Sequence, residues 1–352
     1  MITYDIDLSL REAVGLRSPE QLFLLADTHT QQCCLPLIRK TLDIPDSHIL
    51  CLPEGEQNKN LDTLQTIWNF LLQHNATRTG MLLILGGGTL TDIGGLAAAT
   101  FMRGMPHVNI PTTLLGMVDA SVGGKTGINY GGIKNLIGTF CQPAQVIAYT
   151  PFLRSLPARQ FLSGWAEMIK HTLISSPLQV AALRAFDLHR WFAGPDAEQE
   201  NSLSELIDRS IEIKKYIVEA DPNEEGMRQT LNFGHTVGHA LEALALQKNR
   251  PLLHGYAVMY GMVAELYLSH IVYGFPEKDI QPVVACMKEF YGKPDCACSD
   301  YEELLGLMQH DKKNQLSHDI TFTLLRSIGN YRTGCVCSGQ QIKEALDFLF
   351  NS

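Results

Sequence analysis

Five short apolar segments in the first 150 residues constrain the fold of this chain more than any other feature. They occupy residues 22–26, 49–52, 82–85, 108–110 and 145–148. Between the second and the third, residues 61–72 place apolar side chains at helical spacing on one stripe. Strands that alternate with such helices are typical of a parallel sheet covered on both faces, so the sequence predicts an N-terminal Rossmann-like α/β domain.

The pattern changes after residue 155. Longer helical stretches follow at residues 203–219, 231–245 and 258–272. Residues 319–325 and 330–336 alternate like two strands around Ser327-Ile328-Gly329, which predicts a hairpin appended to the helices. Because 352 residues exceed the size at which one core stops growing, we expect two domains, residues 1–155 and a mostly α-helical second domain of residues 156–352.

Composition and charge narrow the classes of function. The formal net charge of −9 opposes a nucleic-acid surface, so an anionic substrate must meet a local cluster of Lys and Arg. No basic, apolar leader begins the chain and no apolar run reaches membrane-spanning length, so we expect a cytoplasmic protein with no membrane partner. The nine cysteines, an odd number, indicate reduced thiols rather than a disulfide framework.

Three glycines follow the third expected strand. Gly86, Gly87 and Gly88 precede Thr89, and Asp92 stands where a helix should begin. Backbone without Cβ atoms can approach a pyrophosphate closely, and a helix N-terminus offers free N–H groups to its charge. The string differs from the G-x-G-x-x-G fingerprint, and a tight turn that needs positive φ explains the same glycines.

A second glycine-rich stretch, residues 122–135, places Lys125 and Lys134 among five glycines. Flexible backbone combined with Lys charge suits contact with a phosphate or a carboxylate. A solvated glycine loop is the alternative interpretation.

Two strings in the helical half carry side chains that bind metals. Glu167, Lys170 and His171 fall at i, i+3 and i+4 on one helical face, although an ordinary ion pair within the helix explains the first two equally well. His235 and His239 lie four residues apart, a spacing typical of a metal site. Spacing alone assigns both histidines and a carboxylate to a catalytic metal, with a hydrogen-bonded core histidine as the alternative for either.

Four motifs, in this order, resemble the 3-dehydroquinate synthases of the sugar-phosphate cyclase family. They are MVDASVGGKT at residues 117–126, KNLIG at 134–138, AEMIK at 166–170 and LNFGH at 231–235. The resemblance covers nearly the whole chain, from Asp27 to the string DKKN at residues 311–314. Chance does not produce so many ordered motifs.

This resemblance implies a divalent metal, Zn²⁺ or Co²⁺, bound by Glu167, His235 and His254. It makes His239 a substrate contact, against the spacing argument. It also makes His254 a metal ligand, although spacing alone gives a weaker reason to choose His254. The three ligands then come from three separate segments, and a fourth position stays open for substrate.

The resemblance also implies sites for NAD and for a small sugar phosphate. The residues that it assigns to NAD are Asp27, Glu56, Lys59, Gly87, Gly88, Thr89, Asp92, Thr112, Thr113, Lys125 and Lys134. The substrate contacts that it assigns, which are also the candidate catalytic residues, are Arg103, Asp119, Lys125, Lys134, Asn135, Lys170, Lys214, Arg228, Asn232, His239 and Lys312. Their basic members would supply the local positive cluster that the net charge made necessary.

The implied reaction converts 3-deoxy-D-arabino-heptulosonate 7-phosphate to 3-dehydroquinate and phosphate, in the shikimate pathway to chorismate and the aromatic amino acids. NAD⁺ oxidises the C5 alcohol transiently, phosphate leaves, NADH returns the hydride, and an intramolecular aldol reaction closes the ring. The overall step is a lyase reaction in which the metal polarises the C5 oxygen. The family also suggests a homodimer.

Three other functions remain open. They are a cyclase for glucose 6-phosphate or sedoheptulose 7-phosphate, a polyol dehydrogenase of the glycerol-dehydrogenase type, and a catalytically inactive NAD-binding sensor. The resemblance places Lys214, Arg228 and Asn232 around a substrate carboxylate, which those other sugars do not have. These residues therefore favour a dehydroquinate synthase.

Three positions depart from the family pattern. Tyr256 replaces a common Glu, Pro222-Asn223 replaces a charged pair, and His29 replaces an Asn that often meets the cofactor ribose. None of them removes an expected metal ligand or anion contact.

Overall fold

The computed structural model describes residues 2–222, 224–309 and 319–352. They form two compact units, one of residues 1–161 and 188–211, and the other of residues 162–187 and 212–352. We call these unit 1 and unit 2. The functional division expected between residues 155 and 156 stays a prediction.

A five-stranded parallel sheet in the order β2-β1-β3-β4-β7 forms the centre of unit 1. The strands are β1 (Leu22–Asp27), β2 (Ile49–Leu52), β3 (Met81–Gly86), β4 (His107–Pro111) and β7 (Gln145–Val146). Each lies on one of the five apolar segments. The predicted Rossmann-like α/β fold is confirmed.

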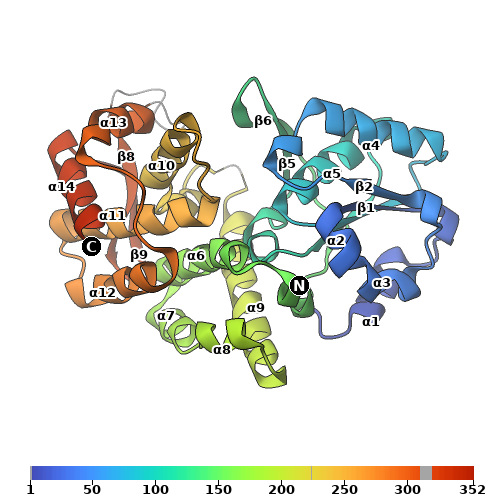
Figure 1. Cartoon of the computed structure of the whole chain (residues 1–352), viewed down its shortest axis with the longest axis horizontal. Helices are drawn as coiled ribbons and strands as arrows, with labels where there is room; N and C mark the ends of the chain where they lie inside the picture. The colour runs from blue at the N-terminus through green and yellow to red at the C-terminus, as the bar shows by residue number, and fades with distance from the viewer. Residues whose placement is uncertain (1, 223, 310–318) are drawn as a thin grey trace. The chain divides into compact units, whose positions relative to one another are not determined.

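Helices cover both faces of this sheet. They are α1 (Ile6–Val14), α2 (Thr28–Cys33), α3 (Leu35–Leu42), α4 (Leu61–Gln73) and α5 (Gly88–Thr100), with α8 (Leu188–Ala193) and the first part of α9 (Ala197–Ala220) also in unit 1. Figure 1 shows α4 and α5 on one face and α1 to α3 on the other. Phe23, Leu25 and Ile84 pack with Ile67 of α4 and Ile93 of α5 in the core between the sheet and these helices. Burial of both faces explains why the strands read as continuous apolar runs.

The strand order fixes where a ligand can approach the sheet. The chain passes from β1 to β2 on one side, then returns to β3 on the other side of β1. In open parallel sheets, ligands bind at the carboxyl ends of the two strands where the order reverses. In unit 1 these ends are Asp27 and Gly86, and Gly86 leads directly into Gly87 and the first turn of α5.

The second glycine-rich stretch forms a hairpin, where the alternative interpretation expected a loop. Strands β5 (Lys125–Tyr130) and β6 (Ile133–Phe140) pair antiparallel. Gly131 and Gly132 at its tip have φ of 60° and 79°, the left-handed values that a two-residue hairpin turn needs. The glycines therefore build a defined turn that presents Lys125 and Lys134 from paired strands.

Unit 2 is mostly helical, as predicted. Its helices are α6 (Ala158–Ser175, from Leu162 onward), α7 (Pro177–Arg184), the end of α9, α10 (His235–Gln247), α11 (His254–Tyr273), α12 (Glu277–Cys286), α13 (Tyr301–Gln309) and α14 (Gly339–Asn351). Helix α11 is buried on nearly every side and packs against α10, α12 and α14. The predicted hairpin is confirmed as β8 (Thr321–Ser327) and β9 (Asn330–Val336).

One helix of unit 2 begins later than the sequence pattern indicated. Periodicity starts at residue 231, but α10 begins at His235 because a 3₁₀ turn, Met227–Asn232, precedes it. Gly234 then takes φ of 79°, which ends the turn and sets a new direction for the helix. The apolar residues of the turn match the helical spacing in the sequence, but they are not part of the helix.

Two further features follow from the described residues. None of the helices there is both long and apolar enough to cross a bilayer. All nine cysteines lie in the described part of the chain and are free thiols.

Removing core volume from the central sheet should lower stability far more than the same change at the surface. Leu83 on β3 is fully buried, whereas Leu72 near the end of α4 is 65% exposed. We expect Leu83→Ala to lower the free energy of unfolding by about 2–5 kcal/mol because it leaves a cavity. The matched Leu72→Ala should change it by less than about 1 kcal/mol. Urea denaturation followed by circular dichroism measures both, and equal effects would contradict this account of the core.

Candidate active site

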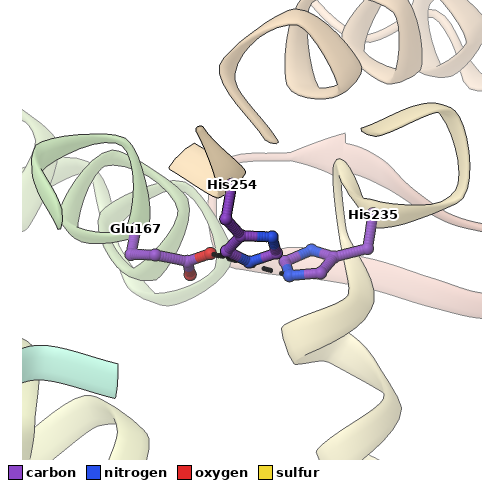
Figure 2. Close-up of side chains that lie close together, drawn as sticks. All are labelled: Glu167, His235 and His254. Atoms are coloured by element: carbon purple, nitrogen blue, oxygen red, sulfur yellow. Dashed lines mark ion pairs between the residues drawn. The ribbon is translucent and has the colours of Figure 1, made fainter. Parts of the chain in front are cut away.

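Three side chains from three helices of unit 2 converge on one point (Figure 2). Glu167 projects from the middle of α6, and His235 and His254 are the first residues of α10 and α11. His235 Nε2 lies 3.6 Å and His254 Nε2 lies 3.4 Å from Glu167 Oε1. A tetrahedral zinc with bonds of about 2.0–2.1 Å holds its ligand atoms roughly 3.3 Å apart. The two measured separations therefore fit a small divalent cation among these atoms.

Each of the two imidazoles is held through its other nitrogen. His235 Nδ1 lies 3.1 Å from the carbonyl oxygen of Phe233, and His254 Nδ1 lies 3.3 Å from Glu242 Oε2 on α10. Such partners fix the ring orientation and the tautomer in metal-binding histidines. With Nδ1 of each ring directed to an acceptor, Nε2 faces the point shared with Glu167, where a bound cation would take the place of a proton.

Two carboxylates contact His254. Burial alone would lower the pKa of His254, but hydrogen bonds with Glu167 and Glu242 outweigh that effect and raise the pKa to about 10. Glu167 is fully buried. The protein groups therefore favour added positive charge at this position, which a divalent cation would supply.

Lys170 and His239 complete the surroundings of the three side chains. Lys170 is buried one turn along α6 and forms the ion pair with Glu167 within the helix that spacing left open. The His239 ring centroid lies 5.3 Å from that of His235 and 6.1 Å from that of His254. Its nitrogens fall outside the compact donor set of Glu167, His235 and His254. Within the described residues, Glu167, His235 and His254 form one of two compact groups of possible metal ligands, and this group is the one that the resemblance implied; His239, which spacing favoured, belongs to neither.

A tight loop of unit 2 carries Arg228. Asp221 organises it by accepting hydrogen bonds from the backbone N–H groups of Glu225 (3.0 Å), Gly226 (2.7 Å) and Arg228 (3.0 Å). The guanidinium Nη1 of Arg228, itself buried, donates to the carbonyl oxygen of Pro222 at 2.8 Å. Pro222, one of the departures from the family pattern, therefore supports Arg228 through its backbone.

The remaining predicted residues of unit 2 are placed as follows. Asn232 ends the same 3₁₀ turn, and its Nδ2 donates to Glu224 Oε1 at 3.2 Å. Lys214 lies buried on α9. Lys312 and Asn223 lie outside the described residues.

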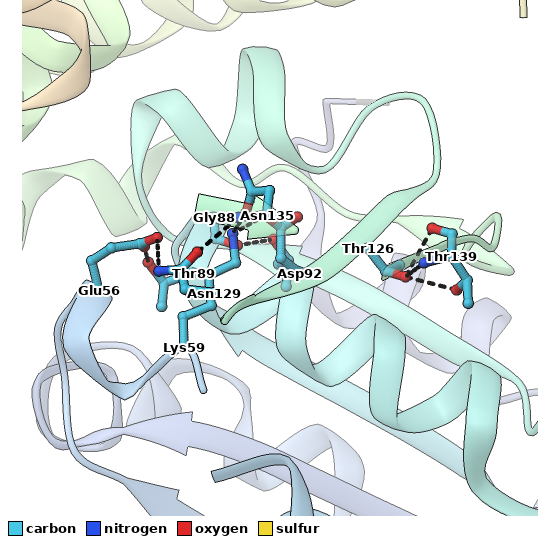
Figure 3. Close-up of polar contacts among 10 residues, drawn as sticks. Glu56, Lys59, Gly88, Thr89, Asp92, Thr126, Asn129, Asn135 and Thr139 are labelled. Atoms are coloured by element: carbon cyan, nitrogen blue, oxygen red, sulfur yellow. Dashed lines mark hydrogen bonds and ion pairs between the residues drawn. The ribbon is translucent and has the colours of Figure 1, made fainter. Parts of the chain in front are cut away.

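Unit 1 carries a polar network at the carboxyl end of its sheet (Figure 3). Glu56 accepts from Thr89 Oγ1 at 2.6 Å and from Asn129 Nδ2 at 2.9 Å. Lys59, 3% exposed, donates to Asp92 at 2.5 Å and to Asn135. The network ties the segment after β2 to the first turns of α5 and to hairpin β5–β6. It brings together five residues predicted for cofactor or substrate: Glu56, Lys59, Thr89, Asp92 and Asn135.

The glycines beside this network lie in a narrow backbone space. A Cβ on Gly87 would come within 2.9 Å of Thr113 Cγ2, and one on Gly88 within 2.8 Å of Ala120 Cβ. Gly87 caps α5 with extended backbone, so the first N–H groups of the helix are not covered by a cap side chain. This arrangement favours the phosphate interpretation over a turn that needs positive φ.

The other predicted residues of unit 1 lie at the end of strand β1, after strand β4, on the hairpin, and after helix α5. Asp27 caps α2 by accepting from Thr30 N at 2.8 Å, and Thr30 Oγ1 bridges to the carbonyl oxygen of Leu85 at 3.0 Å. Those that follow β4 are Thr112, Thr113 and Asp119. Lys125 and Lys134 are exposed on the hairpin, and Arg103, also exposed, lies after α5 with φ of 65°.

Sequence reasoning missed three residues that hold the site in shape. Glu242 contacts His254, Asn129 connects Glu56 to Asn135, and Glu265 accepts from the backbone at the start of α10. Glu242 follows His235 by seven residues and His239 by three, so helical spacing alone could have placed it on their face. Glu265 offered no such signal because its partners are backbone groups.

Two family models together match most of the chain. One described as 3-dehydroquinate synthase N-terminal matches residues 49–163, and one described as 3-dehydroquinate synthase C-terminal matches residues 164–314. The chain belongs to the 3-dehydroquinate synthase family. A 3-dehydroquinate synthase from Parabacteroides distasonis is 44% identical over 352 residues, which are 100% of this chain and 98% of that protein. One from Pyrococcus furiosus is 38% identical over 308 residues, 87% of each chain.

Solved structures agree with the fold of this family. A 2-epi-5-epi-valiolone synthase from Streptomyces hygroscopicus with NAD⁺ and Zn²⁺ bound is 25% identical, with a TM-score of 0.82 over 99% of this chain and 95% of that one. A 2-deoxy-scyllo-inosose synthase in complex with carbaglucose-6-phosphate, NAD⁺ and Co²⁺ is 22% identical, with a TM-score of 0.80 over 98% and 95%. A probable glycerol dehydrogenase from Sinorhizobium meliloti shares the fold at a lower TM-score of 0.61.

Asp221 should control the order of the loop that carries Arg228. Hydrogen bonds from the N–H groups of Arg228, Glu225 and Gly226 lower the pKa of Asp221. The contribution of this carboxylate is therefore complete at neutral pH and is lost as the pH falls through its lowered pKa. We expect Asp221→Ala to remove hydrogen-exchange protection from these three amides at neutral pH, measured as protection factors.

The matched control is Asp196→Ala in unit 1, since Asp196 caps the N–H of Gln199 in the same way. It should expose Gln199 and leave the Arg228 loop protected. Unchanged protection of the loop in Asp221→Ala would contradict the organising role of Asp221.

Proposed function

We propose that this chain is a 3-dehydroquinate synthase, a lyase that converts 3-deoxy-D-arabino-heptulosonate 7-phosphate to 3-dehydroquinate and phosphate in the shikimate pathway. The observation that carries the proposal is the donor set of the buried Glu167 with the partly exposed His235 and His254, whose separations fit a tetrahedral metal. Membership of the family supports the choice of reaction.

We propose NAD and a zinc or cobalt ion as cofactors. When bound, NAD would accept a hydride from the C5 carbon and return it later, and the ion would act as a Lewis acid toward the C5 oxygen. Glu167, His235 and His254 would hold the ion. The sheet end with Asp27, the glycines before α5 and the Glu56–Lys59 segment would hold NAD, which the strand reversal beside β1 supports.

The substrate would be held through its two anionic ends and its hydroxyl groups. Arg228 and Lys214 are both buried cations, and with Asn232 they could give charge-assisted hydrogen bonds to a carboxylate. The resemblance also assigns Lys125 and Lys134 of the unit 1 hairpin to the substrate, and His239 would donate to or accept from a substrate oxygen. Fixing both ends of a flexible sugar phosphate lowers the entropy cost of reaction, so positioning would supply much of the catalysis.

The same residues favour this function over its alternatives. The two cyclases named above share the fold at 22–25% identity, and a cyclase for a sugar without a carboxylate would have no use for buried Arg228 and Lys214 together. A polyol dehydrogenase would also release NADH, which a measurement can detect.

We propose a homodimer that works in the cytoplasm. The hairpin β5–β6 supports self-association because it exposes Tyr130, Ile133, Leu136, Ile137 and Phe140, a group of apolar side chains on one element. The free thiols are consistent with a reducing compartment. A monomeric mass in light scattering at micromolar concentration would contradict the dimer, and recovery in a periplasmic fraction would contradict the location.

Activity should depend on about one divalent metal per chain, held by the three ligands. We expect Glu167→Ala, His235→Ala and His254→Ala each to abolish phosphate release from the heptulosonate phosphate, because two remaining ligands leave an incomplete site. Elemental analysis and the phosphate assay measure this together. Full turnover of a protein shown to be free of metal would contradict the proposal.

His239→Ala is the matched control, since it removes a histidine from the same helix as His235. We expect this variant to retain its metal while losing turnover, because His239 lies outside the donor set. Loss of metal in step with activity would instead make His239 a ligand, as its spacing indicated.

Turnover should produce no net NADH, because the hydride that NAD takes is returned to the same intermediate. A polyol dehydrogenase must instead form one NADH per product, so absorbance of the reduced nicotinamide separates the two functions.

Arg228→Ala should cut turnover of the carboxylated sugar severely, since losing the partner of a desolvated charge costs about 2–5 kcal/mol. Stoichiometric NADH, or faster cyclisation of glucose 6-phosphate, would rule out a dehydroquinate synthase.

A further inference from the structure

Glu265 is a fully buried carboxylate three turns beyond His254 on α11. Its Oε2 accepts a hydrogen bond from Gly234 N at 2.6 Å, and its Oε1 accepts from Thr236 N at 3.1 Å and Val237 N at 3.3 Å. These three amides flank His235 in sequence. Both oxygens of one side chain therefore hold the backbone on either side of His235.

The start of α10 explains why a carboxylate is needed there. The first N–H groups of a helix have no partner within it, and the residue before the helix usually covers them with an oxygen. Here that residue is Gly234, which has no side chain. Its φ is 79°, and a Cβ would come within 2.6 Å of Met262 Cγ and 3.0 Å of the Val258 carbonyl oxygen. The position needs glycine, so the capping oxygen has to come from another element.

Close packing of α10 on α11 lets Glu265 supply that oxygen. A Cβ on Gly238 would come within 3.0 Å of the carbonyl oxygen of Ala257, so the two helices touch backbone to backbone. Ser269, one turn after Glu265 on α11, holds this part of the helix in place. Its Oγ donates to the Glu265 carbonyl oxygen at 2.7 Å and accepts from Leu325 N at 2.9 Å. The carboxylate thus reaches the second and third N–H groups of α10, the ones that a cap residue covers.

Charge is a second reason why the start of α10 needs a carboxylate. The N-terminus of α10 carries positive partial charge, which opposes a cation held by His235 at the same end of the helix. The negative charge of Glu265 offsets it. A neutral side chain of the same shape would cover fewer amides and would leave that positive potential in place.

We propose that Glu265 is a positioning residue for the metal site: it caps α10 from α11, fixes His235, and makes the helix end compatible with a cation. The inference rests on the proposed metal site. Metal ligands must lie within about 0.2 Å of their bonding distance, so a small shift of residues 234–237 is enough to weaken binding. Glu265 itself is no ligand, because its oxygens are engaged by the backbone amides.

The test compares Glu265→Gln with Ser269→Ala, which loosens the same turn of α11 without touching the α10 amides. The zinc dissociation constant is measured by competition with a chromophoric chelator, and the visible spectrum of the Co²⁺-substituted protein reports the ligand geometry. We expect Glu265→Gln to weaken zinc binding about 10–100-fold and to alter the Co²⁺ spectrum. Ser269→Ala should lower the melting temperature but leave zinc binding unchanged, because Glu265 still covers the α10 amides in this variant.

Zinc binding by folded Glu265→Gln that equals the wild type would overturn this inference while leaving the proposed function intact. Equal weakening in Ser269→Ala would also overturn it, because general loosening of α11 would then explain the loss. A wild-type protein that binds no stoichiometric zinc would overturn the proposed metal site and this inference with it. If Glu265→Gln does not fold, Glu265→Asp takes its place: it keeps the charge, withdraws it by one methylene, and should weaken zinc binding in the same direction.

Discussion

Burying the carboxylate of Glu167 without solvent exposure demands positive charge and donors around it, since an isolated ionised group in a protein interior is too costly to persist. Lys170 meets part of that demand from the same helix, and the imidazoles of His235 and His254 meet it from α10 and α11. Three helices that are distant in sequence are therefore tied to one point. The rest of unit 2 keeps those helix ends in register.

Glycine makes that register possible. Gly234, Gly238 and Gly261 occupy places where a Cβ would strike the neighbouring helix, so α10 and α11 approach closely. Closeness in turn lets side chains of one helix serve the other: Glu242 of α10 holds His254 of α11, and Glu265 of α11 holds the start of α10. The support is reciprocal, and each histidine at a helix start is fixed by a carboxylate from the opposite helix.

Periodicity in the sequence predicted the sheet, most helices and the last hairpin, because each of these elements buries one or both of its faces and so carries a regular apolar pattern. It failed at hairpin β5–β6, since a strand with eight exposed residues carries no apolar alternation and its glycines look like loop. Spacing paired His235 with His239, yet the donor set joins His235 to His254, nineteen residues further along the chain, because helix packing and not local spacing decides which nitrogens meet. Motif resemblance reached His254, but nothing in the sequence pointed to Glu265, whose partners are backbone amides.

The departure at Tyr256 follows from the same packing. Its ring lies 4.9 Å from that of Tyr291, whose hydroxyl donates to the carbonyl oxygen of Leu162 on α6 at 2.8 Å. Gly255 N donates to Ser163 Oγ at 3.0 Å, so the start of α11 is joined to α6 at two neighbouring residues. Helix α6 carries Glu167, so these contacts set the distance between Glu167 and His254. An aromatic residue at position 256 can therefore replace a carboxylate without loss of the donor set, because Glu242 holds His254 and the Tyr256–Tyr291 pair holds the helix that presents it.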